Sequence, residues 1–417
     1  MSEAVTEDSA GVQVFLETVP SQDRELIIAA GKKVFSTNPP REIWARSLGR
    51  FGYSGSRLYV GRFRVSPHAR TPNHLAQFAI KIGSVSRIMG EQDKTEAARE
   101  FDSRIYSAIA KRDSAVQQPG QSEAGSGEEL AALILRFEGS GDGHVLELRD
   151  LLVQERLKAT ARDAVVDSVS DYLKVLFVNH LETFHQAHEP KDACFGNQYQ
   201  LSDDDLASVQ TRLDAMDYGR VPHSVDKSPA SELASPKHVY QRLAKLERKL
   251  LCGPIHGDVH PSNVLLCKSA GGKFTPQLID FADYDPRGHV LRDFVLMECS
   301  LRFHRFQRSI NFTEQQKFDD YVLKALFQAT PSRELGCQLN AYNRDNYVAL
   351  YDSVLMIRNC AKTRTESFGH LWNPEDYCIA LFMRLYHLLK YETYSHSAAF
   401  ALGQLAAYIQ KTVKLPA

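Results

Sequence analysis

Alternation of hydrophobic and polar residues in the first third of the chain predicts a β-rich region. The alternation is regular through Leu58–Val65, and short apolar runs with the same character follow. Apolar residues at helical spacing predict a short helix near Leu26 and a longer helix from Arg87 to Arg112. A stretch rich in Ser, Gly and Gln predicts a loop. The predicted strands lie at 44–65, 78–82 and 131–137, and the loop lies at 113–128.

Helical periodicity replaces this alternation after about residue 150. Helices are predicted over 161–188, over 239–251 and from Leu291 onward. One segment, between the last two of these, interrupts the helical pattern. The interruption is a hairpin, in which turn-forming residues separate the apolar runs Val264–Cys267 and Gln277–Ile279. A β-rich front and a helical body predict an α+β protein. We expect an N-terminal extension (1–40), a β-rich N-lobe (41–138) and a helical C-lobe that carries the hairpin (139–417).

Composition narrows the classes of function. The chain has 417 residues, with 50 Lys and Arg against 51 Asp and Glu, and this balance argues against binding to nucleic acid or to a membrane surface. No apolar run approaches the roughly 18 residues of a membrane span. The first residues lack the basic start and apolar run of a secretory signal. Seven cysteines without a C-x-x-C pair favour buried, reduced thiols. We therefore expect a cytoplasmic protein.

Polar residues suited to metal and phosphate chemistry gather around the predicted hairpin. The stretch H-G-D-V-H-P-S-N contains Asp258 and ends at Asn263, where the first strand begins, and Asp280 follows the second strand. An amide and a carboxylate that meet at one end of a hairpin could bind Mg²⁺, and a further carboxylate could orient an attacking hydroxyl. The alternative is that these residues only cap turns. The complete set favours phosphoryl transfer.

This stretch resembles the catalytic loop of the aminoglycoside phosphotransferase and choline kinase group, a branch of the protein-kinase-like fold. The group's pattern is H-G-D-x-H-x-x-N followed by I-D-F or I-D-W, and every signature position is present. The resemblance implies a two-lobed fold and Mg²⁺-dependent transfer from ATP or GTP. It implies that Asp258 is the catalytic base or hydroxyl-orienting carboxylate, and that Asn263 and Asp280 are Mg²⁺ ligands. His256 would brace the loop, and the role of His260 stays open.

A glycine-rich stretch at 49–55 is the candidate phosphate-binding loop of the N-lobe. At Gly52, Ser54 and Gly55 the backbone N–H groups could approach phosphate oxygens closely. The spacing is neither G-x-G-x-x-G nor a P-loop, and a simple tight turn is the alternative.

Lys81 lies between apolar residues of a predicted strand. In the kinase-like arrangement, such a lysine binds the donor phosphates and pairs with a carboxylate of the next helix. The alternative is a surface lysine whose ammonium reaches solvent. Glu96 and Glu100 are equally good candidates for the partner, and Glu91 ranks behind both.

The segment from Ala282 to Phe294 is too short for a regulated peptide-docking loop, which weakens a protein-kinase interpretation. Its end, G-H-V-L-R-D-F, and the loop F-G-Y-S-G-S at 51–56 resemble a bacterial subgroup known as a ternary-complex-associated domain of conflict and signalling systems. In related kinases an acid at the position of Asp293 braces the catalytic loop. An acid at a helix start is also an ordinary N-cap, and we favour a structural role.

The helical tail should form the acceptor site, although most of its polar residues are expected to be surface or packing residues. The candidates are Arg358, Asn359, Lys362, Arg364, Trp372, Asn373 and Glu375. We predict a phosphotransferase that uses ATP or GTP with Mg²⁺ and acts on a hydroxyl of a small molecule. The alternatives are a nucleotide-binding regulatory module with protein partners in a signalling system, and a protein kinase.

Overall fold

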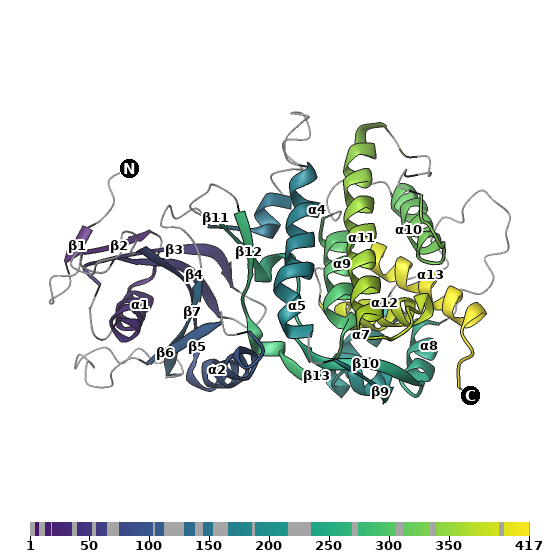
Figure 1. The fold of residues 1–417 in the computed structure, drawn as a ribbon, viewed down its shortest axis with the longest axis horizontal. Coiled ribbons are helices and arrows are strands. Elements are labelled where there is room, and N and C mark those ends of the chain that lie inside the picture. The colour runs from purple at the N-terminus through teal and green to yellow at the C-terminus, as the bar shows by residue number, and fades with distance from the viewer. Residues whose placement is uncertain are drawn as a thin grey trace. The chain divides into compact units, whose positions relative to one another are not determined.

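The chain forms two compact units in a computed structural model (Figure 1). The β-rich unit comprises Met1–Glu147 and Asn263–Tyr284, and the helical unit comprises Leu148–Ser262 and Asp285–Ala417. The structure describes residues 5–7, 13–17, 19–35, 40–51, 56–64, 75–102, 105–111, 129–137, 145–152, 166–185, 188–215, 235–268, 274–305, 312–332, 335, 339, 341–391 and 396–416.

A seven-stranded sheet is the main element of the β-rich unit, with strand order β1-β2-β3-β4-β5-β7-β6. The β2–β3 pair is parallel, and the other pairs are antiparallel. Its elements are β1 (Val5–Glu7), β2 (Gln13–Glu17), α1 (Ser21–Val34), β3 (Glu42–Phe51), β4 (Arg57–Arg64), β5 (Leu75–Ser84), α2 (Val85–Arg99), β6 (Tyr106–Lys111) and β7 (Leu130–Phe137). A smaller sheet, β12-β11-β8, comprises β8 (Val145–Glu147), β11 (Val264–Lys268) and β12 (Phe274–Leu278), and the short helix η6 (Phe281–Asp283) follows it.

The two faces of the large sheet bury different partners, because successive side chains of a strand point to opposite sides. Ile80 of β5 belongs to a buried cluster that includes Ile27 of α1. Ala79, its neighbour, belongs to a second cluster that includes Leu265 and Ile279 of the small sheet. Lys81 has the parity of Ala79. Strand alternation therefore directs Lys81 toward the small sheet and away from α1.

The two units differ from the expected domains in two segments of the chain, residues 1–40 and the hairpin. Residues 1–40, expected to be an extension, supply two strands and a helix to the β-rich unit, and Asp23 of α1 accepts hydrogen bonds from Arg57 and Tyr59 of β4. The hairpin, expected in the C-lobe, also belongs to the β-rich unit. It does so because β11 pairs with β8 and buries Leu265 against the large sheet.

The helical unit contains one three-stranded sheet, β13-β10-β9, and helices on several sides of it (Figure 1). Its elements are α4 (Val166–Val175), the π-helix η2 (Leu176–His180), α5 (Leu181–Phe184), β9 (Glu189–Cys194), α6 (Phe195–Gln198), α7 (Asp203–Ala215), α8 (Pro236–Leu243), β10 (Glu247–Ile255), η5 (Pro261–Asn263), β13 (Asp285–His289), α9 (Leu291–Arg305), α10 (Phe312–Leu326), α11 (Ala341–Ser367), α12 (Pro374–Leu388) and α13 (His396–Thr412). The α+β class predicted from the sequence, with a β-rich and a mainly helical part, is confirmed.

Helix α12 forms the centre of the helical unit. Its residues from Asp376 to Tyr386 are all buried, which is typical of a helix surrounded on every side. It contacts α7, α8, α9 and α13. Such a helix can place a side chain deep inside the unit, and Arg384 is one that it places there.

A buried ionic network links α9, α10, α11 and α12. The Glu298 carboxylate accepts hydrogen bonds from Arg358 at 2.7 and 2.9 Å, from Arg302 at 3.0 Å and from the Tyr377 hydroxyl at 2.8 Å. Burial raises the pKa of Glu298, but the Arg358 and Arg302 guanidinium groups outweigh it and hold that pKa below its usual range. Arg358, an acceptor-site candidate from the sequence, is therefore a structural residue.

Two predicted helices were too long, and in each case a strand replaces the end. The helix predicted over 87–112 ends at Arg99, and Tyr106–Lys111 instead pairs with β7 as β6. The helix predicted over 239–251 ends at Leu243, and β10 begins at Glu247 between β9 and β13. Sheet pairing overrides helical spacing here, as is common where a short apolar run fits either period.

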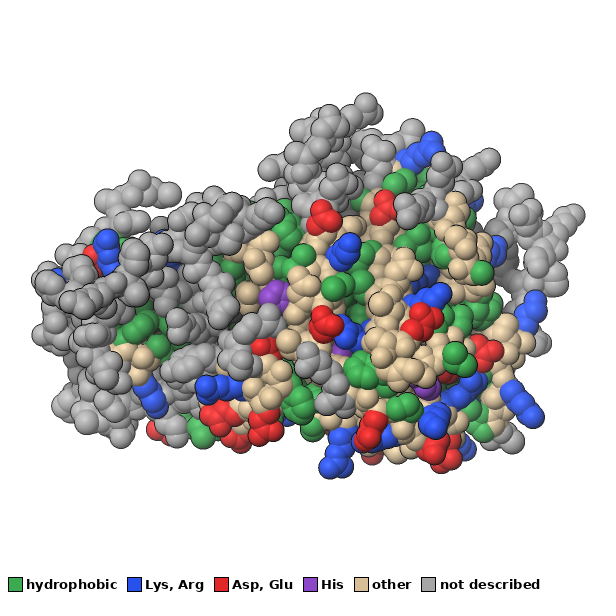
Figure 2. Space-filling view, viewed as in Figure 1, with side chains coloured by type: hydrophobic (Ala, Val, Ile, Leu, Met, Phe, Trp, Pro, Cys, Tyr) green, Lys and Arg blue, Asp and Glu red, His purple; other side chains and the backbone are tan. Residues whose placement is uncertain are grey.

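On the face of the helical unit that Figure 2 shows, acidic and basic side chains are interspersed. This mixture agrees with the nearly equal numbers of acidic and basic residues in the sequence. Within the described ranges, no helix combines the length and the apolar character that crossing a membrane requires.

If α1 is part of the core, Ile27→Ala should lower the unfolding free energy of the β-rich unit by about 2–5 kcal/mol, because Ile27 is fully buried. Gln22→Ala, at an exposed position of the same helix, should change it by no more than about 0.5 kcal/mol. Urea unfolding can be followed through Trp44 fluorescence in a Trp372→Phe background. Equal effects of the two changes would contradict the assignment.

Candidate active site

Lys81 of β5 lies between two carboxylates. Its Nζ is 2.6 Å from Oε2 of Glu91, on α2, and 2.8 Å from Oδ2 of Asp280, just after β12. The side chains of Lys81 and Glu91 are almost completely buried, whereas the Asp280 side chain is 28% exposed. Residues from three separate segments therefore meet at one ammonium, with Asp280 on the more open side.

The charges of this cluster are unbalanced, with two carboxylates around one ammonium. Burial lowers the pKa of Lys81, but the Asp280 and Glu91 carboxylates outweigh it and raise that pKa above its usual value. Burial, together with the Asp280 carboxylate, raises the pKa of Glu91 to about 7. The Lys81 ammonium acts to lower that pKa but is outweighed. Lys81 is thus held charged, and a further cation beside Asp280 would relieve the excess negative charge.

Asn263 and Asp280 stand next to each other at one end of the β11–β12 hairpin. The carbonyl oxygen of Asn263 accepts a hydrogen bond of 3.0 Å from the N–H of Ile279, and the register then pairs Val264 with Leu278. Asp280 has φ 65° and ψ 75°, a left-handed conformation that is unusual for a residue other than glycine. Its carboxylate accepts from the N–H of Ala282. The backbone therefore turns sharply at this carboxylate.

The donor atoms of Asn263 and Asp280 fit Mg²⁺, which prefers oxygen ligands. Magnesium sites commonly use one or two carboxylates together with water and substrate phosphates. Within the described ranges, no three or more His, Cys, Asp or Glu side chains are grouped to hold a metal. The pair could thus hold Mg²⁺ with phosphate oxygens, and a cage made of protein side chains alone is not needed.

Asp258, the predicted catalytic carboxylate, belongs to the helical unit. Its Oδ1 is 3.5 Å from Arg384 and its Oδ2 is 3.4 Å from Nε2 of His260. Burial raises the pKa of Asp258, but the charges of His260 and Arg384 outweigh it and hold that pKa well below its usual range. The carboxylate is therefore ionised at neutral pH. It can accept a hydrogen bond from a hydroxyl, whereas its low basicity makes it a weak proton acceptor.

Asp293, in the first turn of α9, holds the backbone of the catalytic loop. Its carboxylate accepts hydrogen bonds from the N–H of His256 at 3.0 Å and of Gly257 at 2.8 Å. Gly257 has φ 84°, a conformation that glycine adopts without strain. Nε2 of His185 lies 3.3 Å from the same carboxylate. Asp293 thus braces the loop from α9, which agrees with the structural role expected for it.

The other predicted nucleotide-binding residues are placed as follows. Gly52, Ser54 and Gly55 lie outside the described residues. The predicted pairing of Lys81 with Glu96 or Glu100 is wrong: Lys81 pairs with Glu91, the Glu96 side chain accepts from Gln92, and Glu100 lies beyond the end of α2. Glu91 is nearer the start of α2, and its buried position faces β5.

The remaining acceptor candidates have other contacts or are exposed. Asn373 caps α12 by accepting from the N–H of Glu375, and Glu375 pairs with Arg248 at 3.1 Å. Arg364 lies 3.7 Å from Glu182, and the ring of Trp372 packs against Tyr377. The other two candidates, which are exposed on α11, are Asn359 and Lys362.

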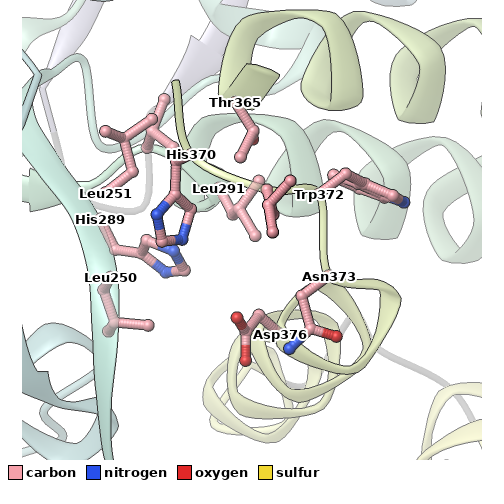
Figure 3. Close-up of a pocket in the computed structure, with 11 residues that line it drawn as sticks. Leu250, Leu251, His289, Leu291, Thr365, His370, Trp372, Asn373 and Asp376 are labelled. Carbon is pink, nitrogen blue, oxygen red and sulfur yellow. The ribbon is translucent and has the colours of Figure 1, made fainter. Parts of the chain in front are cut away.

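A shallow pocket of the helical unit lies between β10 and the connection from α11 to α12 (Figure 3). His289 and His370 lie side by side on one side of it, and Asn373 and Asp376 lie on another. Burial raises the pKa of Asp376 against the opposing charge of Arg248. Asp258 does not line this pocket, so the pocket is separate from the catalytic loop.

Sequence reasoning ranked Glu91 last and did not identify Arg384 or His185. The helical stripe of α2 could have favoured Glu91, because a partner for Lys81 must lie on the buried face of that helix. Arg384 is 126 residues from Asp258 in the sequence, and no local pattern links them.

Comparison with known proteins gives matches of two kinds. A family model described as ternary complex associated domain 9 matches residues 209–390, which is less than half of the chain. No curated protein sequence matches the chain. The family model agrees with the subgroup suggested by the sequence.

The chain is also similar to solved structures of kinases. A glucosamine kinase in complex with glucosamine, ADP and inorganic phosphate is 14% identical, with a TM-score of 0.36, over 95% of this chain and 100% of that one. Spectinomycin phosphotransferase in complex with ADP and spectinomycin is 10% identical, with a TM-score of 0.34, over 95% and 96%. An aminoglycoside phosphotransferase from Streptomyces rimosus is 13% identical, with a TM-score of 0.29, over 72% and 90%. At such TM-scores these matches assign no substrate.

Acid should destabilise the helical unit through His188. This side chain is buried, its ring nitrogens have no hydrogen-bond partner among the described residues, and burial together with the charge of His185 lowers its pKa to about 3. The unfolded chain binds a proton near pH 6.5, so His188 should cost up to about 1.4 kcal/mol of stability per pH unit as the pH falls from 6.5 toward 3. We expect His188→Leu to flatten this dependence.

The control for this prediction is His238→Leu, at an exposed position of α8. Urea unfolding between pH 4 and 7, followed through Trp372 in a Trp44→Phe background, measures both slopes. A pH slope of His188→Leu that equals that of the parent protein would show that His188 titrates normally in the folded state.

Proposed function

We propose that the chain transfers the terminal phosphoryl group of ATP or GTP, bound with Mg²⁺, to a hydroxyl of a small molecule. The observation that carries the proposal is the contact of Lys81 with both Glu91 and Asp280. A lysine held charged by a helix carboxylate, with a second carboxylate on its open side, is the arrangement that kinase-like enzymes use for donor phosphates and metal.

Mg²⁺ would be held by Asn263 and Asp280, and when bound it would neutralise charge on the donor phosphates. Lys81 would then bind phosphate oxygens from the β5 side. Its pairing with Glu91 keeps the ammonium at one position, because the Glu91 carboxylate is buried and belongs to the helix that follows β5. The glycine-rich loop would add backbone N–H groups.

Asp258 would act by orienting the acceptor hydroxyl. A carboxylate with such a low pKa gains little from accepting a proton early in the reaction, but it accepts a hydrogen bond well. This role suits phosphoryl transfer, in which bond formation to the nucleophile lags behind departure of the leaving group. The reaction needs Asp258 and the metal ligands at one phosphoryl group, and only four residues lie between Asp258 and Asn263 in the sequence.

A nucleotide-binding regulatory module is the second candidate. The matching family model is named for a ternary complex, which favours a role in assembly with partners. A module of this kind needs the donor-binding residues but has no need for an ionised Asp258 held by a buried brace. The contacts of Asp293 with His185 and with the backbone N–H of His256, two residues before Asp258, therefore support catalysis over binding alone.

Single changes in the two carboxylates should separate binding from chemistry. We expect Asp258→Asn to lower Mg²⁺-dependent ADP release by about 100-fold or more while nucleotide affinity stays within threefold. Asp280→Asn should weaken binding of Mg·ATP, because it removes a charged metal ligand. ADP release and binding of a fluorescent ATP analogue measure the two effects.

Three outcomes of this experiment have different meanings. Nucleotide binding without Asp258-dependent turnover, across an acceptor panel, would favour the regulatory module. Activity that requires a peptide hydroxyl would favour a protein kinase. Loss of all nucleotide binding in the wild-type protein would reject both the enzyme and the module.

The partner of Lys81 can be tested with three matched variants. Glu91→Gln should weaken binding of Mg·ATP by about 10- to 100-fold, because Lys81 then loses its buried counter-charge. Glu96→Gln and Glu100→Gln should change it by less than threefold. If either of these weakens binding as much as Glu91→Gln, the contact seen in the structure is not the one used with nucleotide.

A further inference from the structure

Arg384 is a buried arginine with most of its hydrogen-bonding capacity unused. It is 8% exposed, and among the described residues its hydrogen bond and ion pair are to Asp258 alone, at 3.5 Å. Its Nε is buried without a hydrogen-bond partner. A guanidinium group has five N–H donors, and a charge-assisted hydrogen bond is normally about 2.7–2.9 Å. One long contact therefore leaves Arg384 under-satisfied.

The neighbouring cations are in a different state, because each has an acid of its own. Lys390 pairs with Asp205 at 3.0 Å, and Arg292 pairs with Asp285 at 3.0 Å. His387 lies one turn beyond Arg384 on α12, and burial followed by the charges of Arg384 and Lys390 lowers its pKa to about 2, so it is neutral. Arg384 differs from these neighbours because its counter-ion is Asp258. In the proposed reaction, Asp258 must also accept a hydrogen bond from the hydroxyl of the acceptor.

We infer that Arg384 binds an anionic group of the acceptor, so that the substrate class is a small hydroxylated acid with a carboxylate or phosphate close to the reacting hydroxyl. The inference rests on the proposed function, because it needs Asp258 to bind the hydroxyl. A carboxylate or phosphate can accept two parallel hydrogen bonds from a guanidinium group, which completes the donors that Asp258 leaves unused.

The reaction balances without another reactant. The acceptor oxygen forms a bond to the γ-phosphorus of the nucleotide, and the bond from that phosphorus to the bridging oxygen breaks, with release of ADP or GDP. The hydroxyl proton, which Asp258 orients through a hydrogen bond, passes to solvent water. The anionic group on Arg384 takes no part in bond making, and it fixes the position of the hydroxyl.

The test uses the full-length protein with Mg·ATP and acceptors that differ by one acidic group. Glycerol is compared with D-glycerate and glycerol 3-phosphate, and glucose with glucuronate and glucose 6-phosphate. ADP release is measured for the wild type, Arg384→Gln and Arg384→Lys. The control is Arg242→Gln, which removes an arginine of α8 whose partners are the carbonyl oxygens of Leu415 and Pro416.

We expect the acidic acceptors to have a higher kcat/KM than their neutral counterparts. Arg384→Gln should raise the KM for the acidic acceptors by about 10- to 100-fold, with the KM for ATP within threefold. Arg384→Lys should restore part of the loss, because an ammonium keeps the charge without the two parallel donors. The carboxylate and phosphate members distinguish the two kinds of anion.

Several results would overturn the inference while leaving the proposed function intact. These are a preference for neutral or cationic acceptors, an Arg384→Gln defect in the KM for ATP, an equal loss with every acceptor and with water, and Asp258-dependent hydrolysis that no acidic compound stimulates or inhibits. Loss of Asp258-dependent ADP release altogether would instead reject the proposed function and the inference together.

Discussion

The ammonium of Lys81, buried between two carboxylates, is the interaction on which the organisation of the β-rich unit depends. A buried lysine is destabilising unless opposite charges surround it closely. Those charges come from α2 and from the end of the hairpin, so both elements must pack on the same face of the large sheet. Strand parity makes this possible, since the residues that alternate with Lys81 in β5 pack against α1 on the other face. The apolar contacts and the ionic contacts therefore select the same arrangement.

The helical unit also contains a buried charge, the Asp293 carboxylate, but holds it mainly with backbone hydrogen bonds. Its catalytic loop must hold backbone N–H groups away from solvent and keep Asp258 ionised. The buried Asp293 carboxylate accepts two of those N–H groups, and His185 contacts the same carboxylate from the end of α5. The charge of Asp293 is thus held by backbone donors and the His185 imidazole, whereas the charge of Lys81 is held by side-chain carboxylates.

Local patterns predicted which residues the hairpin brings together better than they predicted the boundaries of the elements. Asn263 and Asp280 could be placed together because an antiparallel hairpin joins its ends, and the register agrees. The strand at Tyr106–Lys111 was missed because its small apolar residues fit a helix equally well, and only pairing with β7 decides the outcome. Glu91 was ranked too low for a similar reason. Glutamates of one helix differ little in sequence, and burial on the face toward β5 distinguishes them only after the helix has docked.

The same difference between local patterns and tertiary packing explains why the proposed acceptor site could not be predicted from the sequence. The residues proposed to bind the donor phosphates and the metal lie in short motifs, because strand, turn and hairpin geometry keeps them at fixed spacing. Arg384 reaches Asp258 from α12, a helix buried on every side whose position depends on four other helices. A basic residue in an apolar helix is a visible anomaly in the sequence, but its partner is not. The polar residues near the surface connection, which were the acceptor candidates from the sequence, cap α12, pair with residues of other elements or are exposed. The informative residue in the sequence was Arg384, a charged residue within a buried helix.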